Sequence, residues 1–181
     1  MTTQLDHEYG FSPEAGTVRL ERTLPGPIER VWAYLTESEK RAKWFASGPM
    51  ELRPGGKITF QHNNSKLVPD SGPPPEKYKE YEGMTSNGRV IRCEPPHLLS
   101  FTWGEGEDES EVTFELSDRN GEVFLVLTHR RLRNRKEMVN VSGGWHVHVG
   151  ILIDVLNGRE PKPFWSKLEA LEAEYDKRLP Q

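Results

Sequence analysis

Alternating apolar and polar residues predict a series of strands along the chain. In residues 17–24, Val18, Leu20 and Leu24 fall on one side while charged residues fall on the other, the pattern of a half-buried strand. The same alternation, interrupted by turn signals, predicts six further strands at 49–52, 57–61, 88–93, 98–103, 111–116 and 122–130. Because the connections between the later strands are short, these strands are expected to form an antiparallel meander.

Helical spacing of apolar residues predicts two short helices after the first strand and two more helices near the end of the chain. Pro27 suits the first turn of the first short helix, and a Thr-x-x-Glu capping box begins a second at 36–45. A long, mostly apolar helix is expected at 141–156, with Gly158 as its C-cap. Residues 159–181 are expected to form a C-terminal amphipathic helical extension.

This order of elements predicts one domain with helices packed on one face of a sheet. A sheet with a single apolar face is covered most simply by helices on that face, which is an α+β fold. We place the domain at 17–158, with an N-terminal segment at 1–16 that is expected to be flexible. The proline-rich stretch at 61–81 is expected to be a long surface loop, and loops of that length are usually mobile or functional.

Composition and charge exclude several classes of function. The chain has 24 Lys and Arg against 28 Asp and Glu, a formal charge of -4, which disfavours nucleic-acid binding. Its longest apolar run, residues 123–127, is far shorter than the roughly 18 to 20 residues of a membrane helix. The single cysteine and the absence of a signal-peptide pattern favour a cytoplasmic location. Standard phosphate, dinucleotide, hydrolase and zinc motifs are missing, so no cofactor or metal is expected.

Five segments in order resemble the START-like superfamily, also called SRPBCC proteins. Within it they resemble the family named after the C-terminal domain of the activator of the heat-shock chaperone ATPase. The segments are RTLPGPIERVWAYLTESEKRAKWF (22–45), LRPGGKITF (52–60), GRVIRCEPPHLLSFTW (88–103), LVLTHRRL (125–132) and GGWHVHVGILIDVLNG (143–158). The resemblance implies a helix-grip fold, in which a curved antiparallel sheet wraps around a long C-terminal helix and often leaves an apolar cavity.

Fold alone does not give function, because relatives in this superfamily include lipid carriers, aromatic cyclases and proteins without known activity. The sequence favours a non-catalytic domain that binds a small hydrophobic ligand. A first alternative is a protein-interaction module that acts on a chaperone in the stress response. A second is an aromatic cyclase-type enzyme, for which His129 and Arg22 would be the acid and base groups. Nothing in the sequence places a serine, cysteine or lysine nucleophile beside a histidine.

Strand alternation and the helical stripe predict which side chains face the space between sheet and helix. The predicted pocket residues are Phe60, Ile91, Phe101, Trp103, Val112, Phe114, Leu125, Leu127, His129, Trp145, Val149 and Leu152. The same residues could simply fill a solid core, because pockets and cores share this composition. The polar candidates are Arg22, Glu111, His129 and His146. Meander connectivity places the cavity mouth at the end that carries 61–81, 104–110 and 131–138.

Two further features bear on ligands and partners. His129 points inward by strand phase, where a neutral imidazole could bind a ligand or simply be satisfied within the core. His146 and His148 lie two residues apart on a helix, so they face different directions and cannot chelate one metal ion. Residues 123–127 are apolar on both faces of their strand, which raises the possibility that a second subunit covers the outer face in a homodimer.

Overall fold

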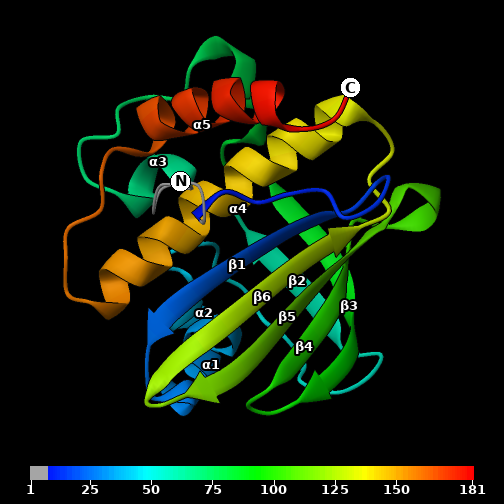
Figure 1. Cartoon of the computed structure of the whole chain (residues 1–181), viewed down its shortest axis with the longest axis vertical. Coiled ribbons are helices and arrows are strands. Elements are labelled where there is room, and N and C mark those ends of the chain that lie inside the picture. The colour runs from blue at the N-terminus through cyan, green and yellow to red at the C-terminus, as the bar shows by residue number, and fades with distance from the viewer. Residues whose placement is uncertain (1–7) are drawn as a thin grey trace.

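The computed structural model describes residues 8–181 and shows one curved sheet gripping a long helix (Figure 1). The sheet has six antiparallel strands in the order β1-β6-β5-β4-β3-β2. The strands are β1 (Val18–Pro25), β2 (Lys57–Gln61), β3 (Thr85–Glu94), β4 (Leu98–Trp103), β5 (Ser110–Arg119) and β6 (Glu122–Arg130). The predicted α+β helix-grip fold is confirmed.

Helices cover one face of this sheet. The helices are α1 (Ile28–Thr36), α2 (Ser38–Arg41), α3 (Asn64–Leu67), α4 (Arg135–Leu156) and α5 (Phe164–Arg178), with short 3-10 turns η2 (Glu76–Tyr81) and η3 (Gly106–Asp108). The long helix α4 crosses the sheet, and α5 lies along α4 (Figure 1). Within residues 8–181, no helix is long and apolar enough to cross a membrane.

The strand predicted at 49–52 is not formed. Residues 47–50 follow the edge of β2 through two isolated bridges, Ser47 with Gln61 and Met50 with Ile58. Pro49 lies between these bridges and has no N–H to donate, although its carbonyl accepts a 3.0 Å hydrogen bond from Thr59. The segment therefore protects the edge of the sheet without extending it.

A bulge in β3 corrects the inward position predicted for Ile91. Val90 pairs with Phe101, and the next inward pair is Cys93 with Leu99, so β3 carries one extra residue between these pairs. Val90 is 1% exposed and takes the inward position, whereas Ile91 is only half-buried. Counting every second residue back from Cys93 therefore predicts Ile91 as the inward residue, whereas the bulge places Val90 there.

The outer face of β6 is covered largely by side chains of the same chain. Val126 is buried, and its cross-strand neighbours on this face are Glu21 of β1 and Glu115 of β5. The guanidinium of Arg119 sits 3.7 Å from the ring centroid of Phe124. The apolar run therefore needs no partner to cover it, and the homodimer stays a prediction.

The stretch predicted as a long surface loop at 61–81 is partly helical and packs against α5. The indole N–H of Trp165 donates to Ser65 Oγ at 3.0 Å, and the Phe164 amide donates to Ser71 Oγ at 2.9 Å. We call residues 64–84, which contain α3 and η2, the lid. The lid and α5 together form a layer over the N-terminal half of α4.

The N-terminal segment is held in place where the structure describes it. The Gly10 amide donates a 2.7 Å hydrogen bond to the Tyr175 hydroxyl, and Phe11 bridges Arg19 of β1. These contacts anchor residues 10 and 11, and the flexibility expected for residues 1–16 stays a prediction. For residues 1–7 that prediction lies outside the described residues.

Candidate ligand-binding cavity

A cavity of about 650 Å³ lies between the sheet, the N-terminal half of α4, α5 and the lid. Its aromatic lining residues are Phe45, Tyr78, Tyr81, Trp103, Trp145, Phe164 and Trp165. Its polar lining residues are His62, Asn64, Lys77, Glu80, His129, Lys136, Glu137, Asn140, His148 and Glu172. The histidines are buried, whereas both lysines, Glu80 and Tyr81 are exposed and mark the mouth.

The inner wall is a cluster of aromatic rings contributed by the sheet, α4 and the segment after α2. The ring of Phe45 lies 5.1 Å from that of Trp145 and 5.7 Å from that of Trp103, measured between centroids. Trp103 and Trp145 meet edge to face at 5.7 Å. Flat, rigid faces of this kind favour a flat apolar guest, which they can contact without reordering flexible chains.

Two consecutive glycines of α4 shape the space. A Cβ at Gly143 would lie 2.8 Å from Glu172 Cγ, so glycine is what lets α5 approach α4 closely here. A Cβ at Gly144, which lines the cavity, would meet no atom within 4 Å. Gly144 therefore leaves open a volume that a larger side chain would occupy.

His129 lies in the cavity wall with both ring nitrogens already engaged. The indole of Trp145 donates to His129 Nδ1 at 3.0 Å, and His129 Nε2 lies 2.7 Å from Ser110 Oγ. Burial lowers the pKa of His129 to about 4, so the ring is neutral at pH 7. Because an indole can only donate, Nδ1 is the acceptor and Nε2 carries the proton that is donated to Ser110.

Ser110 thus lies beside His129, a pairing that no pattern in the sequence indicated, but the arrangement does not activate the serine. A general base needs a free lone pair facing the nucleophile, and His129 presents N–H to Ser110 instead. Trp145 stands where a catalytic triad would hold a carboxylate, and it fixes the opposite tautomer. The pair is a satisfied buried hydrogen-bond chain.

Two further buried histidines, His62 and His148, belong to the wall and were not predicted as site residues. His148 Nδ1 lies 2.8 Å from the carbonyl oxygen of Trp44, and His62 Nε2 lies 2.8 Å from Ser86 Oγ. Burial lowers the pKa of each to about 4. Both rings are therefore neutral at pH 7, and the interior of the cavity carries no imidazolium charge.

The lid is fastened to α5 beside the cavity. The Tyr78 hydroxyl donates a 2.6 Å hydrogen bond to Glu172 Oε2, and the Tyr78 ring stacks on Trp165 with centroids 5.5 Å apart. Burial raises the pKa of the Glu172 carboxyl, and burial together with this hydrogen bond raises the pKa of Tyr78. We call the Tyr78 and Glu172 contact the lid latch.

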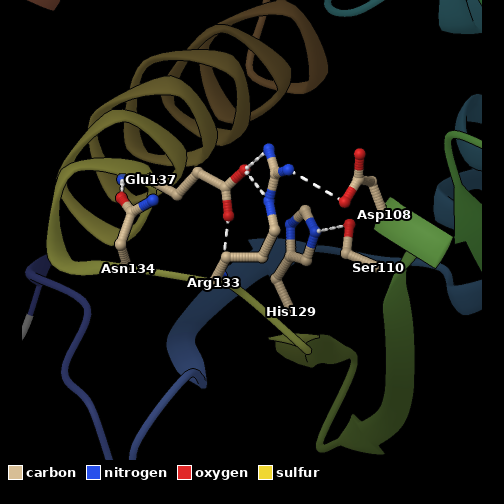
Figure 2. A network of polar contacts seen from close by, with 6 residues as sticks. All are labelled: Asp108, Ser110, His129, Arg133, Asn134 and Glu137. Atoms are coloured by element: carbon tan, nitrogen blue, oxygen red, sulfur yellow. Dashed lines mark hydrogen bonds and ion pairs between the residues drawn. The ribbon is translucent and has the colours of Figure 1, made fainter.

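Figure 2 shows a second fastening at the mouth, where Arg133 joins the hairpin after β4 to the first turn of α4. Its guanidinium lies 2.9 Å from Asp108 Oδ1 and 2.7 Å from Glu137 Oε1. Asn134 caps α4 by accepting from the Glu137 amide at 2.9 Å. These groups are mostly exposed, so they position the mouth more than they stabilise the fold.

The comparisons with known proteins agree with the fold. Residues 25–157 match the family model described as Activator of Hsp90 ATPase homolog 1-like protein. The chain belongs to this family. The protein encoded by gene BPP1335 from Bordetella parapertussis, solved in solution by NMR, is 43% identical and has a TM-score of 0.80, covering 96% of this chain and 91% of that one. No curated protein matched the chain.

More distant solved structures share the fold with this Activator of Hsp90 ATPase homolog 1-like chain. CalU16 from Micromonospora echinospora is 22% identical with a TM-score of 0.66, covering 89% of this chain and 86% of its own. The Aha1 dimer from Colwellia psychrerythraea is 17% identical with a TM-score of 0.60, covering 77% of this chain and 95% of that one. At these identities the likeness shows the fold alone.

Of the predicted site residues, the structure brings Trp103, His129 and Trp145 together around the cavity of this family member. The others of the inward set lie in the filled part of the core, away from the lining. They are Phe60, Phe101, Val112, Phe114, Leu125, Leu127, Val149 and Leu152. The inward residues therefore divide into a packed group and a smaller group that faces open space.

Three polar candidates do not line the cavity. His146 Nδ1 lies 2.9 Å from the Tyr175 hydroxyl, next to the N-terminal segment. Arg22 donates to the carbonyl of Glu8 at 3.1 Å, and Glu111 lies 3.7 Å from Arg131. The acid and base pair suggested for a cyclase, His129 and Arg22, is thus not assembled around one space. Within the part of the chain that the structure describes, no cluster of three potential metal-ligating residues occurs.

The residues that sequence reasoning missed come from the lid, α5 and the segment after α2. Phe45, Tyr78 and Trp165 were visible as aromatic residues at helical or turn positions, but no local pattern shows that they converge. His148 was considered only as a metal ligand together with His146. Its place in the wall depends on the tertiary contact with Trp44.

Proposed function

We propose that this protein binds a small apolar, aromatic ligand in the cavity between the sheet, α4 and the lid, without a covalent step. The observation that carries the proposal is the volume of about 650 Å³, open at its mouth, whose inner wall is a cluster of aromatic rings. Ligand pockets typically have 300 to 1,000 Å³ and a mainly apolar lining with a few polar groups.

The polar groups of the wall support binding rather than catalysis. His129, the titratable group nearest to a serine, is neutral and held in a tautomer that cannot take the serine proton. Both its nitrogens are occupied within the protein. The wall thus offers shape and a small number of hydrogen-bonding atoms, which is what orients a bound molecule.

The test is to fill the cavity from α4 and to measure the binding of Nile red, an uncharged dye that fluoresces in apolar surroundings. In the Gly144→Leu variant the new side chain should occupy the open space, and dye affinity should fall by at least about tenfold, the loss of roughly 1.4 kcal/mol. The fold should survive, because a Cβ at this position meets no atom within 4 Å and glycine is a poor helix former.

The matched control is Gly150→Leu. Gly150 lies in the same helix and also has no atom within 4 Å of a built Cβ, but it does not line this cavity. Dye affinity in this variant should equal that of the unaltered protein. Equal binding by both variants, or no dye binding by the unaltered protein, would contradict the proposal. Native mass spectrometry of gently purified protein should in addition show a co-purifying apolar compound.

The second candidate function is the binding of a protein partner, which the description of the family suggests. In that case the chain would raise the ATPase rate of a purified chaperone, and Gly144→Leu would leave this effect unchanged because the residue faces inward. The chaperone partner and the cytoplasmic location stay predictions.

A further inference from the structure

His148 of the cavity wall has one ring nitrogen without a hydrogen-bond partner, and its role as an acceptor is fixed. His148 is 6% exposed, and its Nδ1 lies 2.8 Å from the carbonyl oxygen of Trp44. A carbonyl oxygen only accepts, so Nδ1 carries the proton and Nε2 of the neutral ring keeps a lone pair. Across residues 8–181, no group donates a hydrogen bond to that Nε2. The protein itself therefore leaves this acceptor without a donor, on a residue that lines the cavity.

The other two wall histidines do not present a fixed acceptor in this way. His129 uses both nitrogens, toward Trp145 and Ser110. His62 bonds Ser86 through Nε2, and a serine hydroxyl can donate or accept, so the free nitrogen of His62 can take either role. Among these three wall histidines, only His148 has its tautomer set by a carbonyl. Asn64 Oδ1, which also lines the cavity, is a buried oxygen without a hydrogen-bond partner among residues 8–181. The wall therefore offers acceptors to a hydrogen-bond donor, and His148 Nε2 is the one on α4 whose role the tautomer fixes.

The charges around the cavity disfavour an anionic ligand. Burial lowers the pKa of His62, His129 and His148 to about 4, so none is positively charged at pH 7. The half-buried carboxyl of Glu172 lines the same space. The lining cations are Lys77 and Lys136, both exposed at the mouth, and Lys77 lies 3.8 Å from Glu169. A carboxylate or phosphate buried among these groups would lose its hydration without gaining a cation.

We propose that the ligand is an uncharged aromatic molecule bearing a hydroxyl group, and that this hydroxyl donates a hydrogen bond to Nε2 of His148. The proposal rests on the proposed function, since it names the chemistry of the molecule that fills the same cavity. Stacking against Trp145 and Phe45 supplies the apolar contact, and the single hydrogen bond sets the orientation.

Three biphenyls of nearly equal shape test the proposal at pH 7 by isothermal titration calorimetry. 4-Phenylphenol carries the donor, 4-methoxybiphenyl has the same oxygen without its proton, and biphenyl-4-carboxylate is an anion. The phenol should bind roughly 3- to 10-fold more tightly than the ether, the effect of one net hydrogen bond. The carboxylate should bind more weakly than both.

The His148→Phe variant should remove this preference. Phenylalanine keeps a ring in place but has no acceptor, so the phenol and the ether should bind with equal affinity. The matched control is His146→Phe, two residues away in α4, whose imidazole is equally buried but faces Tyr175 outside the cavity. It should keep the full ratio between phenol and ether.

The outcomes separate the two proposals. If none of the three biphenyls and no Nile red binds, the proposed function itself fails. If the ether or the carboxylate binds as tightly as the phenol, the cavity is a binding site but the hydroxyl assignment is wrong. A preference for the phenol that persists in His148→Phe would also overturn the role of Nε2. If that variant does not fold, the ratio measured on the unaltered protein still decides.

Discussion

The two halves of α4 pack against the protein in opposite ways. In the C-terminal half, Val149 and Leu152 are 0% exposed and belong to the filled core. In the N-terminal half, Val141, Gly144 and Trp145 face a cavity of about 650 Å³, and His148, just past the midpoint, is the last residue of the helix in its lining. The sequence of both halves is apolar, and one helix carries both. The two halves differ in the elements and side chains that pack against them.

The C-terminal half of α4, which we call the packed half, contacts large side chains of the sheet. The N-terminal half, which we call the hollow half, lies under the lid and α5. Phe101 and Phe114 stack 6.1 Å apart within the filled core. At the other end the lid is anchored to α5 by hydrogen bonds and by ring stacking, so it spans the space without filling it. Whether an apolar stripe faces a core or a cavity is thus decided by the layer above it and by one small residue, Gly144.

The largest expected effect comes from the packed half. Leu152→Ala should lower the free energy of unfolding by about 2 to 5 kcal/mol, because truncation loses burial and leaves a new cavity in a close-packed site. The comparison variant is Leu168→Ala on α5, also buried but lining the existing cavity. It should cost less, since no new void is created. Urea unfolding at pH 7 measures both, and equal losses would contradict the division between halves.

Local sequence pattern was enough for most of the fold. The strands at 57–61, 98–103 and 122–130 have the predicted bounds, because alternation and turn signals are local properties of the chain. Two errors arose where backbone detail overrides alternation, at Pro49 and at the bulge beside Ile91. The long helix starts at Arg135, six residues before the predicted 141, because polar residues of its first turns face the mouth and the solvent.

The cavity itself was much less accessible to sequence reasoning. Alternation indicates which side of a strand faces inward, but it does not say whether the space there is filled. The lid includes a four-residue helix and a 3-10 turn that are held by contacts to α5, almost 100 residues away in sequence. Contacts of this kind, such as Ser65 with Trp165, leave no periodic signal. Sequence reasoning therefore predicted the end of the sheet at which the cavity opens, but not most of the residues that line it.

Acidification should act mainly on the hollow half, with a smaller effect per histidine and pH unit than that of Leu152→Ala. Burial lowers the pKa of His62, His129 and His148 to about 4, below the roughly 6.5 of an unfolded histidine. Between these values the unfolded chain binds more protons than the folded chain. The stability that depends on neutral histidines is therefore complete above about pH 6.5 and is lost as the pH falls toward 4.

Each of these histidines should contribute a slope of at most about 1.4 kcal/mol per pH unit, and His146, with its pKa lowered to about 3, adds a further one. Urea unfolding measured in steps from pH 7 to pH 5 gives the slope. In the His146→Phe variant, this slope should decrease by the contribution of one histidine. Glu172, whose pKa is raised by burial, has the opposite sign and reduces the total slightly. A flat profile over this range would mean that the histidines are not held neutral.

The smallest expected effect is on the lid, and it separates opening of the cavity from loss of the fold. Tyr78→Phe keeps the ring that stacks on Trp165 but removes the 2.6 Å hydrogen bond to Glu172. Global stability should fall by only about 0.5 to 1.5 kcal/mol, the net value of one hydrogen bond. If the lid must open for the ligand to leave, Nile red should dissociate roughly 3- to 10-fold faster, because the same free energy no longer holds the lid closed.

Stopped-flow dissociation measures that rate, with Tyr34→Phe as the matched control. Tyr34 is a buried tyrosine of α1 that does not line the cavity, and its hydroxyl bonds to no group among residues 8–181. Its variant should leave the dissociation rate unchanged. Glu172→Gln keeps an oxygen that accepts from Tyr78, so it should accelerate dissociation less than Tyr78→Phe. An unchanged rate in Tyr78→Phe, together with the expected loss of stability, would show that the ligand leaves through the mouth beside Arg133 while the lid stays closed.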